Sequence, residues 1–261
     1  MSQRSGVVCP LIVLVACAAL ACKQSPEEKR AAAAEEARLK AKLTDYIGKL
    51  AAVTKAVEAV DKASFKDKPC DGAALEAAAP AGKKGALSLR SAYLPWMKRF
   101  GAPKTEWKAN AGDWKFITDS TFAGHFEKHP DDRDSYAAKD TGKRIEETFE
   151  PERYLVVVAP DDESKNALPV WHDEGPFDSG DFQGWMFVVD TTDASIACQK
   201  RLEIESSEEI EYRTGGRKLG RLTNQNPKTV LQDDFEDNLE DAIQKALKPV
   251  GLSTSMGRIL K

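Results

Sequence analysis

The chain of 261 residues has few of the side chains on which many enzymes depend. It contains three histidines and five cysteines, and its formal net charge at pH 7 is −4. A mildly acidic chain lacks the basic surface that nucleic-acid-binding proteins use, so no nucleic-acid partner is expected. It contains no G-x-S-x-G nucleophile elbow and no P-loop, because the Gly-rich stretch at 214–220 lacks the Gly-Lys-Ser/Thr ending. The sequence therefore identifies no catalytic activity.

Long apolar runs are also scarce. The main one, from Val7 to Ala21, is interrupted by Pro10 and is about 15 residues long, too short to cross a hydrocarbon core of roughly 30 Å. It follows Arg4 and ends in small residues, which is the pattern of a secretory signal peptide. We therefore expect residues 1–21 to be a signal peptide that directs export.

Two cysteines end this run, in Leu14-Val15-Ala16-Cys17 and Ala19-Leu20-Ala21-Cys22. Both segments resemble the lipobox of bacterial lipoproteins, roughly Leu, then Ala, Ser, Thr or Val, then Gly or Ala, then Cys. Cys17 matches at every position, whereas the segment before Cys22 departs from the pattern twice. The resemblance implies a cysteine that carries diacylglycerol and an acylated amine, and several acyl chains anchor a protein stably in a membrane. Lys23, where an Asp would signal inner-membrane retention in such families, favours the outer membrane.

Two arguments favour Cys22 as the lipidated residue, with Cys17 as the alternative. Cleavage before Cys17 leaves an apolar stub at 18–21, whereas a polar linker follows Cys22 directly. Lipidation of Cys22 also removes both earlier cysteines and leaves Cys70 and Cys198 as one pair in an oxidising compartment, where disulfides persist. We predict a disulfide between them; the alternative is two separate buried thiols.

A long helix is predicted directly after the linker. Ser25 and Glu28 form a capping-box pattern around Pro26, and the following residues are strong helix formers as far as about Lys62, roughly 55 Å of helix. We expect residues 22–38 to form a linker and stalk. From residue 39 an apolar stripe recurs with the heptad spacing of a coiled coil: Leu39, Leu43, Tyr46, Leu50, Val53, Val57 and Val60. Its expected cover is the protein's own domain; self-association or a partner helix is the alternative.

The remainder is expected to be a single α+β domain over residues 39–261. Residues 39–100 are predicted to be helical, with a short helix at 71–79 and another from residue 86 up to Pro95. In the mixed region 101–153, part of 114–122 is predicted as a strand and 144–149 as a helix.

Residues 154–223 carry the β signal. An antiparallel meander is predicted from alternating or β-branched runs with short connections. These runs are at 154–159, 184–190, 195–206, 208–213 and 219–223. An amphipathic helix is predicted at 234–248. Because strands and helices are segregated along the chain, the helices are expected to pack on one face of an antiparallel sheet.

Three histidines are weak candidates for a metal site. His125 and His129 are spaced i, i+4, as zinc ligands on one helix face are, and His172 is the remaining histidine. The motif is not H-E-x-x-H, because Glu127 lies one position too late. Surface or packing roles are favoured, so neither a metal nor another cofactor is expected.

Trp107 and Trp114 are candidate sugar-stacking residues because they lie among Lys and Gly residues, although core packing is the favoured interpretation. Taken together, the sequence predicts a membrane-anchored protein of the bacterial cell envelope that faces the periplasm or the cell surface. Its expected role is non-catalytic binding or scaffolding, with an envelope protein or a glycan as partner. The alternatives are a glycan- or peptidoglycan-binding module and, less favoured, a metal-dependent envelope hydrolase.

Overall fold

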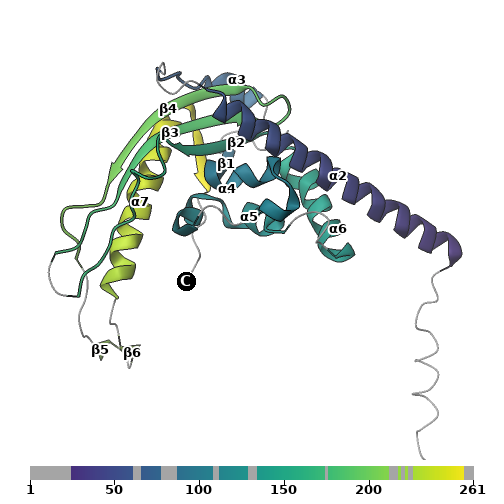
Figure 1. Cartoon of the computed structure of the whole chain (residues 1–261). Helices are drawn as coiled ribbons and strands as arrows, with labels where there is room; N and C mark the ends of the chain where they lie inside the picture. The colour runs from purple at the N-terminus through teal and green to yellow at the C-terminus, as the bar shows by residue number, and fades with distance from the viewer. Residues whose placement is uncertain are drawn as a thin grey trace, which may run out of the picture.

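The computed structural model describes residues 25–60, 66–77, 87–107, 112–128, 134–173, 176–211, 217–218, 221–222 and 226–255 (Figure 1). The predicted signal peptide and both candidate lipidation sites, Cys17 and Cys22, lie outside these residues.

A five-stranded mixed sheet forms the centre of the fold, in the order β4-β3-β2-β1-β7. Its strands are β1 (Leu87–Tyr93), β2 (Tyr154–Pro160), β3 (Asp181–Asp190), β4 (Ile196–Glu205) and β7 (Leu252–Ser255). β2, β3 and β4 pair antiparallel as the predicted meander, whereas β1 is parallel to both β2 and β7. A separate small hairpin consists of β5 (Arg217–Lys218) and β6 (Arg221–Leu222). The α+β class is confirmed, and the sheet has more strands than the meander alone.

β1 corrects the prediction of a helix up to Pro95. The stretch LSLRSAY contains residues common in helices, but here it pairs with β2 and β7, and Leu89 and Ala92 are fully buried. Pairing with strands distant in the sequence decides this conformation, because strand preference depends on tertiary context more than helix preference does. Pro95 lies in the first turn of α4 (Leu94–Met97) instead of ending a helix.

The predicted strand within 114–122 is also wrong. This stretch forms the 3₁₀ helix η4 (Gly112–Ile117) and the start of α5 (Ser120–Phe126). The carboxylate of Asp119 accepts a hydrogen bond from the backbone N–H of Phe122 at 2.7 Å, which caps α5. Residues 208–211 form no strand in the described part of the chain, so the meander ends at Glu205.

Helices cover both faces of the sheet, whereas the sequence predicted helices on one face only. The parallel pair β1 and β2 requires a crossover, and this crossover contains α4, α5, α6 (Ser135–Arg144) and the π-helix η6 (Ile145–Phe149), where a helix was predicted. The chain later returns from β4 to β7, in the opposite direction across the sheet, through α7 (Pro227–Leu247). Right-handed crossovers in opposite directions cover opposite faces.

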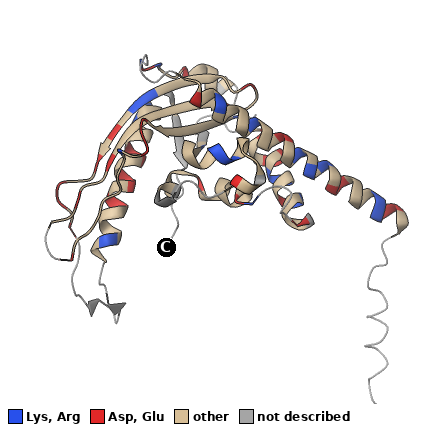
Figure 2. Cartoon of the chain, viewed as in Figure 1, with Lys and Arg blue, Asp and Glu red and all other residues tan. Residues whose placement is uncertain are grey.

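α7 begins earlier than the predicted Asp234, because the Asn226 side chain caps it and Pro227 occupies its first turn. It packs against β4 and β7 and buries one residue in every four: Leu231, Phe235, Leu239, Ile243 and Leu247. Acidic residues occupy its outer surface (Figure 2). The remaining short elements are α3 (Gly72–Ala77), where a helix was predicted, η2 (Lys98–Gly101), η3 (Lys104–Glu106) and η7 (Lys248–Val250).

The long N-terminal helix, α2 (Pro26–Glu58), begins at the predicted capping box. The Glu28 backbone N–H donates to Ser25 Oγ at 3.1 Å, and the Ser25 backbone N–H donates to the Glu28 carboxylate at 2.6 Å. Residues 25–34 are exposed, and α2 projects away from the domain at this end (Figure 1). From Leu39 to Val57 the apolar stripe is buried by the domain itself, with side chains at most 3 % exposed. The prediction that the protein's own domain covers this stripe is therefore confirmed.

α2 is attached to the crossover helices by a close contact and by ion pairs. Gly142 of α6 packs against the backbone of Leu39, and its missing side chain makes this approach possible. Glu150 pairs with Lys42 at 2.6 Å and with Lys49 at 3.0 Å. Burial acts most strongly on Glu150 and raises its pKa, but the two lysines together outweigh it and hold the pKa below its ordinary value.

Candidate functional site

An open pocket, whose lining surface is mostly apolar, lies between α5 and α6. It has a volume of about 430 Å³, within the range of about 300–1,000 Å³ that is typical of small-ligand sites. α5 contributes Ser120, Thr121, Gly124 and His125, and α6 contributes Tyr136, Ala137, Asp140 and Thr141. Residues three and four positions apart lie on one face of a helix, so each short helix presents its lining residues together.

β1 holds the start of α5 in place. Ser91 Oγ donates to the Ile117 carbonyl at 2.7 Å, the Tyr93 backbone N–H donates to Thr118 Oγ1 at 3.0 Å, and the Asp119 backbone N–H donates to the Ser91 carbonyl at 2.8 Å. Residues 117–119 thus follow the edge of β1 beyond the end of β7. The pocket wall formed by α5 is fixed to the central sheet.

A buried charge cluster reinforces this attachment. The guanidinium of Arg90 on β1 lies 3.3 Å from the Asp119 carboxylate and 2.8 Å from the Glu152 carboxylate. Its charged end lies over the Phe149 ring, 4.8 Å from the centroid. Because an unpaired buried charge is strongly unfavourable, the three charges must be kept together. The cluster therefore fixes α5 and η6 relative to β1.

His125 forms part of the pocket floor. Its Nδ1 lies 3.5 Å from Thr141 Oγ1 and 3.9 Å from Asp140 Oδ2, and its ring meets the Phe149 ring edge-on at 5.6 Å. The His125 side chain is 19 % exposed and that of Asp140 is 63 % exposed. The imidazole is thus positioned by the core, while the carboxylate remains open to solvent at the rim.

Tyr136 is the most prominent side chain at the pocket. It is 82 % exposed, and Val170 is the other large hydrophobic residue that is exposed in the described part of the chain. Single exposed apolar residues are common on protein surfaces. A tyrosine exposed at this pocket, however, gives it an aromatic ring face beside its hydrogen-bonding groups.

Of the pocket residues, the sequence reasoning selected only His125. A local signal was present for the rest: Asp119-Ser120 and Asp134-Ser135 are both helix N-cap patterns. The Asp134 carboxylate accepts from the Ala137 backbone N–H at 2.6 Å, as Asp119 does in α5. Two capped helices separated by a short loop predict a helical hairpin, which places their facing side chains in one pocket.

His172, another candidate metal ligand, does not join His125. His172 lies on the connection between β2 and β3, where its Nε2 is 2.9 Å from Asp178 Oδ2. His129 lies outside the described residues. Within the described ranges, no three His, Cys, Asp or Glu side chains are grouped as metal ligands would be.

Trp107 and Trp114 are both partly buried against the core. Trp107 Nε1 donates to the Ala102 carbonyl at 3.0 Å, and its ring meets Phe100 edge-on. Trp114 contacts Phe182 of β3 and Phe235 of α7. These contacts are those expected of core packing, which was the favoured interpretation of both residues.

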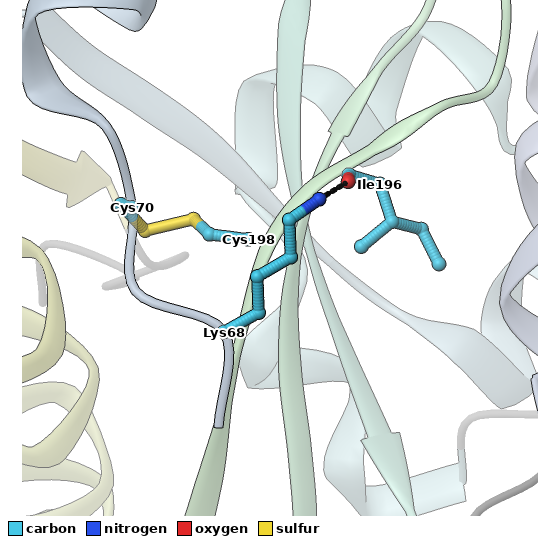
Figure 3. The surroundings of a disulfide bond; sticks show 4 residues. All are labelled: Lys68, Cys70, Ile196 and Cys198. Carbon is cyan, nitrogen blue, oxygen red and sulfur yellow. Dashed lines mark hydrogen bonds between the residues drawn. A yellow bond between two sulfur atoms is a disulfide. The ribbon is translucent and has the colours of Figure 1, made fainter. Parts of the chain in front are cut away.

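Cys70 and Cys198 form a disulfide, as the sequence predicted, with their Cα atoms 4.8 Å apart across 128 residues of sequence (Figure 3). The segment before Cys70 lies along the outer edge of β4. Lys68 exchanges backbone hydrogen bonds with Gln199 at 3.0 and 3.1 Å, and its Nζ donates to the Ile196 carbonyl at 2.7 Å. The disulfide therefore fastens a cover over part of an edge strand, which protects that edge from pairing with another chain.

Among the helices that the structure describes, none combines the length and the apolar character needed to span a membrane. Comparison of this chain with protein-family models, with curated proteins and with solved structures finds no match.

Proposed function

We propose that the chain is a lipid-anchored protein of the bacterial cell envelope that binds a ligand close to the membrane. Two features support export and anchoring: the signal sequence with its lipobox-like end, and the Cys70–Cys198 disulfide. Disulfides form and persist in oxidising compartments such as the periplasm and the cell surface. Lipidation at Cys22, with a place in the outer membrane, is the favoured form of this proposal.

The geometry of α2 carries the proposal. The capping box starts the helix at Ser25, three residues after Cys22, and three extended residues reach about 10 Å. Residues from Pro26 to Arg38, which precede the buried stripe, add about 20 Å of helix. The domain is therefore held within about 30 Å of the membrane by a short, stiff tether.

The pocket is on the side of the domain that the tether approaches. The hydrogen bond with Arg38 contributes most to lowering the pKa of Glu35, and the charges of Lys139 and Lys143 on α6 add to this effect. The first turns of α6 thus lie beside the exposed part of α2, and both helices point their N-termini in the same direction (Figure 1). A ligand in the pocket would lie between the domain and the membrane.

Binding through the pocket fits the structure better than scaffolding through the stripe of α2. A scaffold that used this stripe would leave part of it exposed, whereas the domain buries it from Leu39 to Val57. The pocket instead offers several side chains with hydrogen-bonding capacity at an accessible surface. A glycan or an envelope protein remains the proposed type of partner.

The anchor is tested by labelling cells with a fatty acid. We expect Cys22→Ser to abolish label incorporation and membrane association, and Cys17→Ser, the matched control, to keep both. Labelled Cys22→Ser protein would contradict the assignment of the anchor.

Binding is tested by crosslinking in cells. A photoreactive residue in place of Thr121 should give an adduct in the envelope fraction, and one in place of Thr44, exposed on α2 outside the pocket, should not. Equal adducts, or none, would contradict binding at this pocket.

A further inference from the structure

We infer that the pocket between α5 and α6 binds a saccharide, with the Tyr136 ring as the surface on which a sugar stacks. The inference rests on the proposed function and specifies its ligand.

The first argument is that an exposed aromatic ring lies beside a few polar side chains at this pocket. A pyranose ring has an apolar face of C–H groups and a rim of hydroxyl groups, so its binding site must offer both kinds of surface. Tyr136, 82 % exposed, supplies the apolar face. Ligand sites generally pair an apolar surface with a few placed polar groups that set orientation.

The second argument is the hydrogen-bonding capacity of the lining. The hydroxyls of Ser120 and Thr121, both exposed, can each donate and accept, as sugar hydroxyls do. The Asp140 carboxylate can accept from two neighbouring hydroxyls, and it is 63 % exposed and therefore accessible. Small residues, Gly124 and Ala137, complete the lining and leave room beside the ring.

The third argument is charge. None of the lining residues that the structure describes is Lys or Arg, whereas Asp140 contributes a negative charge. Sites for phosphate or carboxylate ligands use Arg, Lys or a run of backbone N–H groups. The lining therefore favours an uncharged or amino-bearing sugar over an anionic ligand.

The location allows two sources of the same chemistry. Because the tether holds the domain within about 30 Å of the membrane, both a cell-wall glycan strand and the sugar headgroup of a glycolipid are within reach. Tyrosine is also enriched at membrane interfaces. Insertion of Tyr136 into a lipid surface without sugar is therefore the competing explanation that the test must separate.

The experiment uses the full acylated protein in detergent micelles. Binding is measured to a soluble β-linked N-acetylglucosamine oligosaccharide, to purified cell-wall glycan by co-sedimentation, and to vesicles with or without a glycolipid. The test variants are Tyr136→Ala and Asp140→Asn. The matched controls are Val170→Ala, which removes the other exposed apolar side chain, and Asp178→Asn, which neutralises an exposed carboxylate beside His172.

We expect saccharide binding that Tyr136→Ala weakens about tenfold, a loss of about 1.4 kcal/mol of binding free energy when the stacking surface is removed. Asp140→Asn should also weaken it, and both controls should bind like the wild type. Preference for cell-wall glycan or for glycolipid vesicles identifies the source. Unchanged thermal melts of the variants confirm that they fold.

Three results would overturn the inference: no binding to any of the saccharides, equal binding by Tyr136→Ala, or binding to vesicles irrespective of glycolipid. The proposed function fails separately, through the fatty-acid label. Saccharide binding by a protein that is not acylated in cells would refute the anchor and leave the pocket assignment standing.

Discussion

Gly142 of α6 is the point at which the tether helix is most sensitive to a single added methyl group. A Cβ at this position would lie 2.6 Å from the Leu39 carbonyl oxygen and 2.8 Å from Leu39 Cβ. Both atoms belong to the rigid part of α2, so the contact cannot be relieved by rotating a flexible side chain. We therefore predict that Gly142→Ala separates α2 from α6 near Leu39.

The magnitude follows from two opposing effects. Replacing glycine by alanine inside a helix stabilises it by about 1 kcal/mol, whereas forcing extra volume into a packed contact costs about 1–3 kcal/mol. Gly48 of α2 is the matched control, because nothing lies within 4 Å of a Cβ built there. Gly48→Ala should gain the helical stabilisation alone. We expect Gly142→Ala to be about 1–3 kcal/mol less stable than Gly48→Ala.

Chemical and thermal unfolding of the two variants measure this difference. For a domain of this size, 1 kcal/mol corresponds to about 2–4 °C in Tm, so the two melting temperatures should differ by several degrees. Hydrogen exchange should also quicken at residues 35–45 of α2 in Gly142→Ala, and not in Gly48→Ala. The reasoning is refuted if Gly142→Ala is as stable as Gly48→Ala with unchanged exchange.

Further predictions concern the disulfide, the ion pairs of α2 and the cap of α5. Non-reducing mass spectrometry should recover Cys70 and Cys198 in one linked peptide pair, and two freely alkylated thiols would contradict the bond. Replacing both cysteines by alanine should lower the free energy of unfolding by up to about 5 kcal/mol for a loop of this length. Because folding lowers the pKa of Glu150, its stabilisation is present above the ordinary pKa and is lost as pH falls through the lowered value. Urea midpoints measured between pH 6 and pH 3 should therefore fall less steeply for Glu150→Gln than for the wild type, and parallel curves would show that this carboxylate does not contribute. Asp119→Ala removes the cap of α5 and a buried partner of Arg90, so a loss of about 2–4 kcal/mol is expected in the same assay, whereas a loss below 1 kcal/mol would show that the cluster is not needed.

The sequence was most reliable where structure is determined by neighbours in the chain. The capping box at Ser25 predicted the start of α2 to the residue, because each of its hydrogen bonds spans three positions. The meander from Tyr154 was predicted for a similar reason: its strands are β-rich, and a short turn joins β3 to β4.

The clearest failure, at β1, comes from partners distant in the chain. β1 was predicted as helix because its pairing partners, β2 and β7, are about 65 and 165 residues away in the sequence. The strand predicted before Phe122 gave way to a helix capped by Asp119, whose carboxylate is also held by Arg90 of β1. For β1 the distant partners decided the conformation, whereas α5 also had a local N-cap pattern at Asp119-Ser120 that the strand prediction overlooked.

The candidate pocket shows the same division. The sequence selected His125 for its spacing to His129, but Tyr136 and Asp140 attracted no attention because only the packing of α6 against α5 makes them neighbours of His125. A pocket depends on the relative placement of two helices, and that placement is fixed by β1 and by the close approach of Gly142 to Leu39.

The sequence by itself therefore determined the start of α2 and the cysteine pair, and it is the source of the predicted signal peptide and lipidation site, because these depend on residues adjacent in the chain or on a count of cysteines. The tertiary structure decided that the sheet is mixed, that the domain buries the stripe of α2, and that the exposed Tyr136 lines the pocket between α5 and α6. These features arise from contacts between segments far apart in the chain, and the energy of such contacts is set by packing and burial, which a local pattern does not contain.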